Sequence, residues 1–183
     1  GYRIVQIDVT EGDVKSMHLR SIFSFSYRDY YDFEEGTYVQ LQRFTPGKNG
    51  HEFHSIMMSD TPMERRTNLR VVDLAKGDLL IAGLGIGMLH KDEVESLTVI
   101  EKTAPIIEMV GPLAHQWAQD AGKKLDIINA DIFDLGLPKK AKWDVIYFDI
   151  WDDISGDNYE DMKRLTAKFK YRRKSGGWMG AWR

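Results

Sequence analysis

The sequence predicts an α/β protein with a doubly wound, mainly parallel sheet of about five strands. From residue 77 onward, short apolar runs alternate with helical patterns, which is typical of a parallel sheet covered on both faces. The first run, residues 78–82, is mostly aliphatic and leads into a glycine-rich loop, as expected of a buried strand in such a sheet. We expect this domain to span residues 61–183, after a small β-rich N-terminal region over residues 1–60.

The N-terminal region is predicted to contain one strand and then a hairpin with two arms. Residues 3–9 alternate partly between apolar and polar side chains, as in a half-buried strand. A stricter period of two runs over residues 37–44, residues 46–50 have the composition of a turn, and residues 51–58 form the returning arm.

The aromatic and histidine side chains of this region are expected to be structural. Residues 22–33 are rich in Phe and Tyr, which can line a substrate pocket but more often fill a core. His51 and His54 are three apart on a predicted strand, so they point to opposite faces and make a poor metal pair. Since the other histidines are scattered, we expect no metal site.

The α/β domain is predicted to open with a helix. Thr61 is a suitable N-cap, Pro62 occupies the first helical position, and Glu64 completes a capping box. This helix is expected to run to Lys76 and to stop at Gly77.

The remaining elements alternate between strands and helices. The strands expected after the glycine loop cover residues 97–100, 125–130, 143–148 and 178–182. One helix is expected to begin near Pro105 and to be broken or kinked at Gly111-Pro112. Another, near residues 157–173, buries apolar side chains at helical spacing, namely Met162, Leu165 and Phe169.

The glycine loop is the main candidate for a ligand site. Gly83, Gly85 and Gly87 let the backbone turn sharply and approach a ligand without interference from a Cβ atom. The loop is neither a dinucleotide fingerprint, because Met88 stands where the third glycine belongs, nor a P-loop, because Gly-Lys-Ser/Thr is absent. The alternative is a glycine-rich turn without a ligand.

Three successive predicted strands end in a carboxylate: Glu101, Asp131 and Asp149. In open α/β sheets ligands bind beyond the carboxyl ends of the strands, so these acids should converge on the glycine loop. Glu101 lies 18 residues after Gly83, about where an acidic side chain accepts hydrogen bonds from both hydroxyls of an adenosine ribose. Asp131 suits the exocyclic amine of an adenine, with Ile132 or Phe133 against the ring.

Over residues 77–183 this pattern resembles the Rossmann-like fold of class I S-adenosylmethionine-dependent methyltransferases, and most closely their spermidine synthase branch. Two features carry the likeness to that branch. Ile81 stands where most methyltransferases of the class have an acidic residue, as in spermidine synthases, and Asp149-Ile150-Trp151-Asp152 matches their Asp-x-x-Asp pair. The small β-rich region before the glycine strand is also similar.

The resemblance implies the role of each residue. Asp149 and Asp152 would orient and deprotonate an attacking amine, so they are the expected catalytic residues. The expected cofactor-binding residues are Gly83, Gly85, Gly87, Glu101, Asp131, Ile132 and Asp149. The cofactor that the resemblance implies is S-adenosylmethionine or its decarboxylated form.

Two departures from the family stand out, and the first favours methyl transfer over aminopropyl transfer. Spermidine synthases place a tyrosine and a histidine before the glycine strand to hold the polyamine, and residues 60–66 contain neither. The methyltransferase fold also adds an antiparallel hairpin after the fifth strand, so the resemblance predicts a domain truncated at that point.

Two other classes of function stay open. One is a nucleoside-binding protein without catalysis. The other is nucleic-acid binding through the basic C-terminal part, since residues 162–183 carry eight basic and no acidic side chains; a basic helix face is usually only solvated, and no base-stacking motif accompanies it.

Composition bounds the remaining possibilities. The chain has no cysteine, which excludes disulfides and thiolate chemistry, and no apolar run of membrane-spanning length. We therefore expect a cytoplasmic protein without a membrane partner, acting on a small-molecule acceptor such as an amine. The sequence leaves open whether the chain forms a homo-oligomer.

Overall fold

A computed structural model describes residues 1–22, 34–47, 51–84, 92–138, 140–151 and 156–182. They form two compact units, Gly1–Leu69 and Arg70–Arg183, each described by itself below. Of the predicted aromatic segment 22–33, residues 23–33 lie outside the described residues. None of the described helices is both long and apolar enough to cross a membrane.

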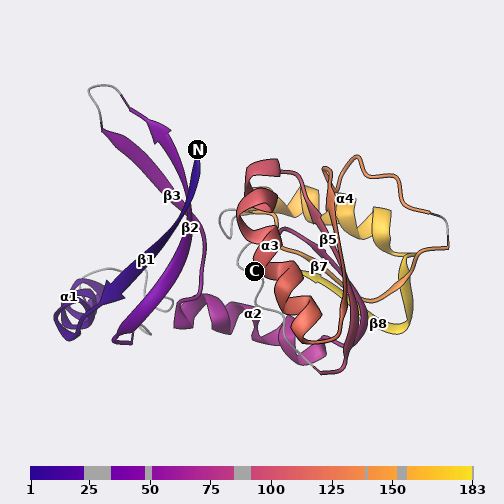
Figure 1. Cartoon of the computed structure of the whole chain (residues 1–183), viewed down its shortest axis with the longest axis horizontal. Helices are drawn as coiled ribbons and strands as arrows, with labels where there is room; N and C mark the ends of the chain where they lie inside the picture. The colour runs from indigo at the N-terminus through magenta and orange to yellow at the C-terminus, as the bar shows by residue number, and fades with distance from the viewer. Residues whose placement is uncertain (23–33, 48–50, 85–91, 139, 152–155, 183) are drawn as a thin grey trace. The chain divides into compact units, whose positions relative to one another are not determined.

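The first unit contains a three-stranded antiparallel sheet in the order β1-β2-β3 (Figure 1). Its elements are β1 (Tyr2–Val9), α1 (Glu11–Ile22), β2 (Gly36–Pro46) and β3 (Glu52–Ser59). The predicted hairpin is therefore confirmed, and a register shift between Leu41 and Gln42 marks an irregularity in its ladder. The central strand β2, which pairs with a strand on either side, carries most of the burial in this sheet, with Leu41 at 1% exposure.

The helix α2 (Pro62–Leu74) begins where the sequence predicts, but its N-terminus is held differently. The Glu64 carboxylate accepts hydrogen bonds from the N–H and the hydroxyl of Ser59, at 2.6 and 2.7 Å. The expected capping box would bring this carboxylate to Thr61, so that detail was wrong: the side chain reaches two residues further back. Burial raises the pKa of Glu64, and the hydrogen bonds from Ser59 oppose the shift.

The second unit is built on a five-stranded sheet in the order β6-β5-β4-β7-β8, in which every neighbouring pair is parallel (Figure 1). Its strands are β4 (Gly77–Ala82), β5 (Val94–Glu101), β6 (Lys124–Asn129), β7 (Trp143–Phe148) and β8 (Arg173–Ala181). Its helices are α3 (Ala104–Asp120), the short η2 (Gly156–Asn158) and α4 (Tyr159–Phe169). The predicted fold class, a doubly wound Rossmann-like sheet of five strands, is confirmed.

Helices cover both faces of this sheet. Leu80 of β4 packs in one apolar cluster with Leu165 and Phe169 of α4. Its neighbour Leu79 belongs to a second cluster with Val71, from the C-terminal half of α2. Because successive side chains of a strand point to opposite faces, these two clusters lie on the two sides of the sheet.

The sequence predicts a break or a kink at Gly111-Pro112; α3 runs without interruption through Pro112, so there is no break. Proline removes the hydrogen bond to the carbonyl four residues earlier, which belongs to Glu108. Both Pro112 and Glu108 are exposed, so water can satisfy that carbonyl. Gly111 faces the sheet instead, where a Cβ atom would come within 3.6 Å of Ile127.

Candidate functional site

The predicted site residues follow one another along one end of the five-stranded sheet. In the order of the strands, Asp131 follows β6, Glu101 ends β5, Gly83 follows β4 and Asp149 follows β7. We call the end of the sheet at which these four residues lie the carboxyl end. Since neighbouring strands are spaced about 4.8 Å apart, the row extends over roughly 14 Å. The strand order reverses between β4 and β7, which is where open α/β sheets bind ligands.

Gly83 and Asp149 stand together at this reversal. The N–H of Gly83 donates to the carbonyl of Ile100 and the N–H of Asp149 to the carbonyl of Ala82, both at 2.8 Å. Gly83 has a φ of +103°, and a Cβ atom on it would overlap the carbonyl oxygen of Asp149. Glycine is therefore needed here because two strand ends approach closely. The other two loop glycines, Gly85 and Gly87, lie outside the described residues.

Glu101 is buried at the carboxyl end, with 8% exposure. One carboxylate oxygen accepts a hydrogen bond from the N–H of Leu84 at 3.0 Å, and the other from the N–H of Thr103 at 2.7 Å. The side chain thus ties the start of the glycine loop to the N-terminus of α3. A carboxylate offers about four acceptor positions, so both oxygens keep the capacity to accept from a ribose hydroxyl.

Asp131 organises the turn after β6. Its Oδ1 accepts the N–H of Phe133 at 2.8 Å, and its carbonyl accepts the N–H groups of Asp134 and Leu135. Within this turn Ile132 is only 4% exposed and belongs to the apolar cluster beneath the sheet end. The structure therefore gives Ile132 a packing role besides any contact with a ligand.

The segment after β7 adds a residue that the sequence analysis did not select. The indole Nε1 of Trp151 is buried and has no hydrogen-bond partner in the part of the chain that the structure describes. A buried donor left unpaired costs free energy, so this indole is a further residue to consider beside Asp149. The only signal in the sequence is its position between Asp149 and Asp152. Asp152 itself lies outside the described residues.

The basic C-terminal side chains are largely engaged within the chain. Lys163 pairs with Glu160 at 2.9 Å and Arg164 with Asp161 at 3.6 Å, both on α4. Lys174 pairs with two carboxylates of the sheet, and Lys168 and Arg172 donate to backbone carbonyls. Such pairing does not favour a surface for nucleic acid, which needs cations free to meet phosphates.

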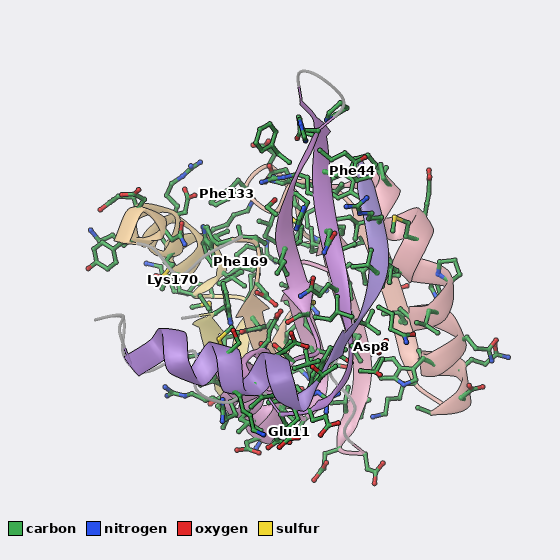
Figure 2. All side chains as sticks on the ribbon, turned by 90° about the vertical axis from the view of Figure 1, so that its left-hand side faces the viewer. Asp8, Glu11, Phe44, Phe133, Phe169 and Lys170 are labelled. Atoms are coloured by element: carbon green, nitrogen blue, oxygen red, sulfur yellow. The ribbon has the colours of Figure 1, made fainter. Side chains whose placement is uncertain are left out.

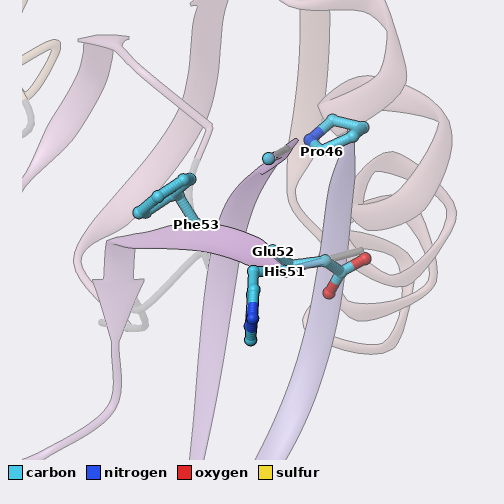
Figure 3. A pocket seen from close by; sticks show the side chains of 5 residues that line it. Pro46, His51, Glu52 and Phe53 are labelled. Carbon is cyan, nitrogen blue, oxygen red and sulfur yellow. The ribbon is translucent and has the colours of Figure 1, made fainter. Parts of the chain in front are cut away.

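A cavity of about 720 Å³ lies elsewhere, at the tip of the β2–β3 hairpin (Figure 3). It is lined by Pro46, Gly47, His51, Glu52 and Phe53. Phe53 is 71% exposed, and Glu52 is paired with Arg3 at 2.8 Å. None of the predicted site residues lines this cavity.

Comparisons with known proteins find solved structures that are similar to the chain, of which three are described. A methyltransferase dependent on S-adenosylmethionine from Clostridium acetobutylicum is 20% identical, with a TM-score of 0.40 over 63% of this chain and 45% of that one. The N-methyltransferase NodS from Bradyrhizobium japonicum is 19% identical, with a TM-score of 0.47 over 67% of this chain and 68% of that one. Spermidine synthase from Thermotoga maritima is 17% identical, with a TM-score of 0.39 over 72% of this chain and 58% of that one.

The chain thus spans less than half the length of the Clostridium protein and somewhat more than half that of the Thermotoga protein. No protein-family model and no curated protein matches the sequence.

Proposed function

We propose that the chain is an S-adenosylmethionine-dependent transferase that moves a methyl group to a small-molecule acceptor. The observation that carries the proposal is the row of Asp131, Glu101, Gly83 and Asp149 along the carboxyl end, with the reversal of strand order beside Gly83. Such a row offers acceptors at successive positions along an extended adenosine ligand.

The row of carboxylates suits an adenosyl sulfonium compound, whose amine and hydroxyl groups donate hydrogen bonds. Asp131 presents a carboxylate to an exocyclic amine, Glu101 presents two oxygens to the ribose hydroxyls, and Asp149 lies toward the reacting end. When bound, the cofactor supplies an electrophilic carbon on its sulfonium. The residues of the chain then have two tasks: to align the acceptor with that carbon, and to take the proton of the attacking group, for which we propose Asp149 with Asp152.

Aminopropyl transfer from decarboxylated S-adenosylmethionine to a polyamine is the second candidate. It needs residues that hold the polyamine, and the segment 60–66 has neither the tyrosine nor the histidine of spermidine synthases. Its acids also have structural partners, because Asp60 accepts the N–H of Val39 at 2.7 Å and Glu64 holds Ser59. These contacts favour methyl transfer.

Calorimetric titration with three ligands tests the proposal: S-adenosylmethionine, its decarboxylated form and S-adenosylhomocysteine. A methyltransferase should bind S-adenosylmethionine and S-adenosylhomocysteine. It should also transfer labelled methyl groups to a member of an acceptor panel. Preference for the decarboxylated form, with transfer to a diamine, would establish the aminopropyl reaction instead. Binding without turnover on any acceptor would favour a non-catalytic nucleoside-binding protein, and no binding would refute the proposal.

A further inference from the structure

The turn after β6 is held from outside by cations of the C-terminal part. The hydrogen bonds within the turn run to the side chain and the carbonyl of Asp131 rather than to the carbonyls of Ile132 and Phe133. The ammonium of Lys168 on α4 donates to both of these carbonyls, at 2.9 and 2.7 Å. One side chain therefore fixes the two peptide groups that directly follow the predicted adenine contact.

Two arginines extend this attachment. The guanidinium of Arg164, one turn before Lys168 on α4, lies 4.7 Å from the ring centroid of Phe133, and Phe133 lies beside α4 in Figure 2. Arg172, just after α4, donates to the carbonyls of Leu137 and Pro138. Residues four apart on a helix share a face, which explains how Arg164 and Lys168 meet the same loop.

The surroundings of Lys168 fit a structural cation. Partial burial lowers the pKa of its ammonium, and the nearby carboxylates of Asp134 and Asp131 oppose that shift. An ammonium that donates to two carbonyls makes charge-assisted hydrogen bonds, which are stronger than neutral ones. Beneath the same loop, Ile132 packs with Leu165 and Phe169, so the loop is held by its backbone and its apolar side chain together.

We propose that Lys168 is the positioning residue of the adenine subsite. By fixing the carbonyls of Ile132 and Phe133, it holds the Asp131 carboxylate at the carboxyl end of the sheet before a ligand arrives. This inference rests on the proposed function. When the loop is ordered before binding, no binding free energy is lost in ordering it. The contribution of Lys168 should therefore appear in the affinity for the adenine base.

Lys168→Met tests the inference, with Lys163→Met as the matched control on the exposed face of the same helix. The first readout needs no ligand: backbone amide hydrogen exchange of residues 133–137. Exchange should accelerate at least about tenfold in Lys168→Met and stay unchanged in Lys163→Met, because only the former releases the loop. Lys168→Arg, which keeps a cationic donor, should restore most of the protection.

The second readout is the preference between S-adenosylhomocysteine and its inosine analogue, in which an oxo group replaces the exocyclic amine. Lys168→Met should bind the adenosyl compound about tenfold more weakly than the parent, and the inosyl compound nearly as before, so that the preference disappears. A purely structural role would weaken both compounds equally.

The outcomes separate the inference from the function on which it rests. Unchanged exchange in Lys168→Met, or an undiminished preference for the adenosyl compound, would overturn the inference while leaving the proposed function standing. If the parent protein binds neither compound, the proposed function fails and the positioning role falls with it; accelerated exchange would then identify Lys168 as a support of the loop alone.

Discussion

The acidic side chains at the two ends of the five-stranded sheet have different kinds of partner. At the amino end, Asp78 of β4 and Asp144 of β7 share the ammonium of Lys174 from β8, at 2.8 and 2.7 Å. At the carboxyl end, Glu101 and Asp131 accept hydrogen bonds from backbone N–H groups of the loops that follow β4, β5 and β6. At the amino end the carboxylates form ion pairs with an ammonium group. At the carboxyl end they fix the conformation of loops, and their oxygens can accept further hydrogen bonds.

From this contrast we expect the amino end to contribute mainly to stability and the carboxyl end mainly to ligand binding. Substitutions at the amino end should change the free energy of unfolding and its pH dependence without changing ligand affinity. Substitutions at the carboxyl end should change ligand binding or turnover, with smaller effects on stability wherever backbone geometry is preserved. Each prediction below compares a variant from one end with a control of similar chemistry.

The largest effect is expected at Gly83, where the backbone itself is constrained. Gly83→Ala should lower the free energy of unfolding by roughly 2–5 kcal/mol, because the positive φ strains an L residue and the new methyl group meets the Asp149 carbonyl. Gly122→Ala is the control: its φ is +66°, and nothing lies within 4 Å of the added Cβ. It should cost only about 1–2 kcal/mol in urea denaturation. Equal losses in the two variants would show that the close approach to Asp149 contributes nothing.

Asp149→Asn should reduce turnover by at least about a hundredfold while cofactor affinity and melting temperature are retained, since an amide cannot accept the proton of an attacking amine. Asp126→Asn removes the same charge from an exposed position on β6 and should leave turnover unchanged. Single-turnover rates with saturating cofactor make the comparison. A modest loss of rate that is matched by a lower melting temperature would assign Asp149 a structural role and leave the reaction without an identified base.

Glu101→Ala should weaken the binding of S-adenosylhomocysteine by about 1.5–3 kcal/mol, the range for hydrogen bonds to charged groups. An analogue lacking both ribose hydroxyls should bind the variant and the parent about equally. Glu95→Ala, an exposed glutamate of the same strand, is the control and should change neither affinity. If Glu101→Ala still discriminates against the deoxy analogue as strongly as the parent, its carboxylate serves only Leu84 and Thr103.

Much of the fold was predictable because its signals are local. The apolar run of β7 was expected over residues 143–148 and is found at those bounds, since both faces of a central parallel strand are buried. That the acids lie at the same end of the sheet was expected from the rule for parallel strands, whereas the order of the strands comes from the structure alone. The continuity of α3 was missed because the cost of Pro112 depends on whether the carbonyl of Glu108 can reach water, which a sequence does not reveal.

The supports of the candidate site were not predictable in the same way. The contacts of Lys168 join residues 35 and 36 positions apart, and they end on backbone carbonyls that have no signature in side-chain patterns. The Lys174 pair with Asp78 joins residues 96 positions apart. In the sequence these cations form one basic run, which suggests a single basic surface for nucleic acid. In the structure they bind different partners within the chain.

The smallest of the predicted effects, and the clearest test of the contrast between the two ends, is expected at Lys174. Hydrogen bonds from Lys174 and Ser96 hold the pKa of Asp78 below its ordinary value. Burial alone would raise the pKa of Asp144, but hydrogen bonds from Lys174 and from the Asp78 N–H outweigh it and lower that pKa. The two carboxylates in turn raise the pKa of Lys174.

Each shift defines the pH range in which the network stabilises the fold. A carboxylate with a lowered folded pKa contributes stability above its unfolded pKa, near 3.9 for Asp, and loses it as the pH falls through the folded value. An ammonium with a raised folded pKa contributes fully below its unfolded pKa, near 10.4, and loses its contribution only as the pH rises through the folded value. The network is therefore intact at pH 7 and should weaken below about pH 4.

Lys174→Met should accordingly cost about 1 kcal/mol of unfolding free energy at pH 7, a small value because the three side chains are partly exposed and screened by solvent. At pH 3 the difference from the parent should shrink, because the parent begins to lose the same interactions. Lys142→Met removes an exposed charge just before β7 and should leave both values unchanged. The affinity for S-adenosylhomocysteine should be the same in all three proteins. A loss of affinity in Lys174→Met comparable with that in Glu101→Ala would mean that the two ends of the sheet are coupled, and the division between them would not hold.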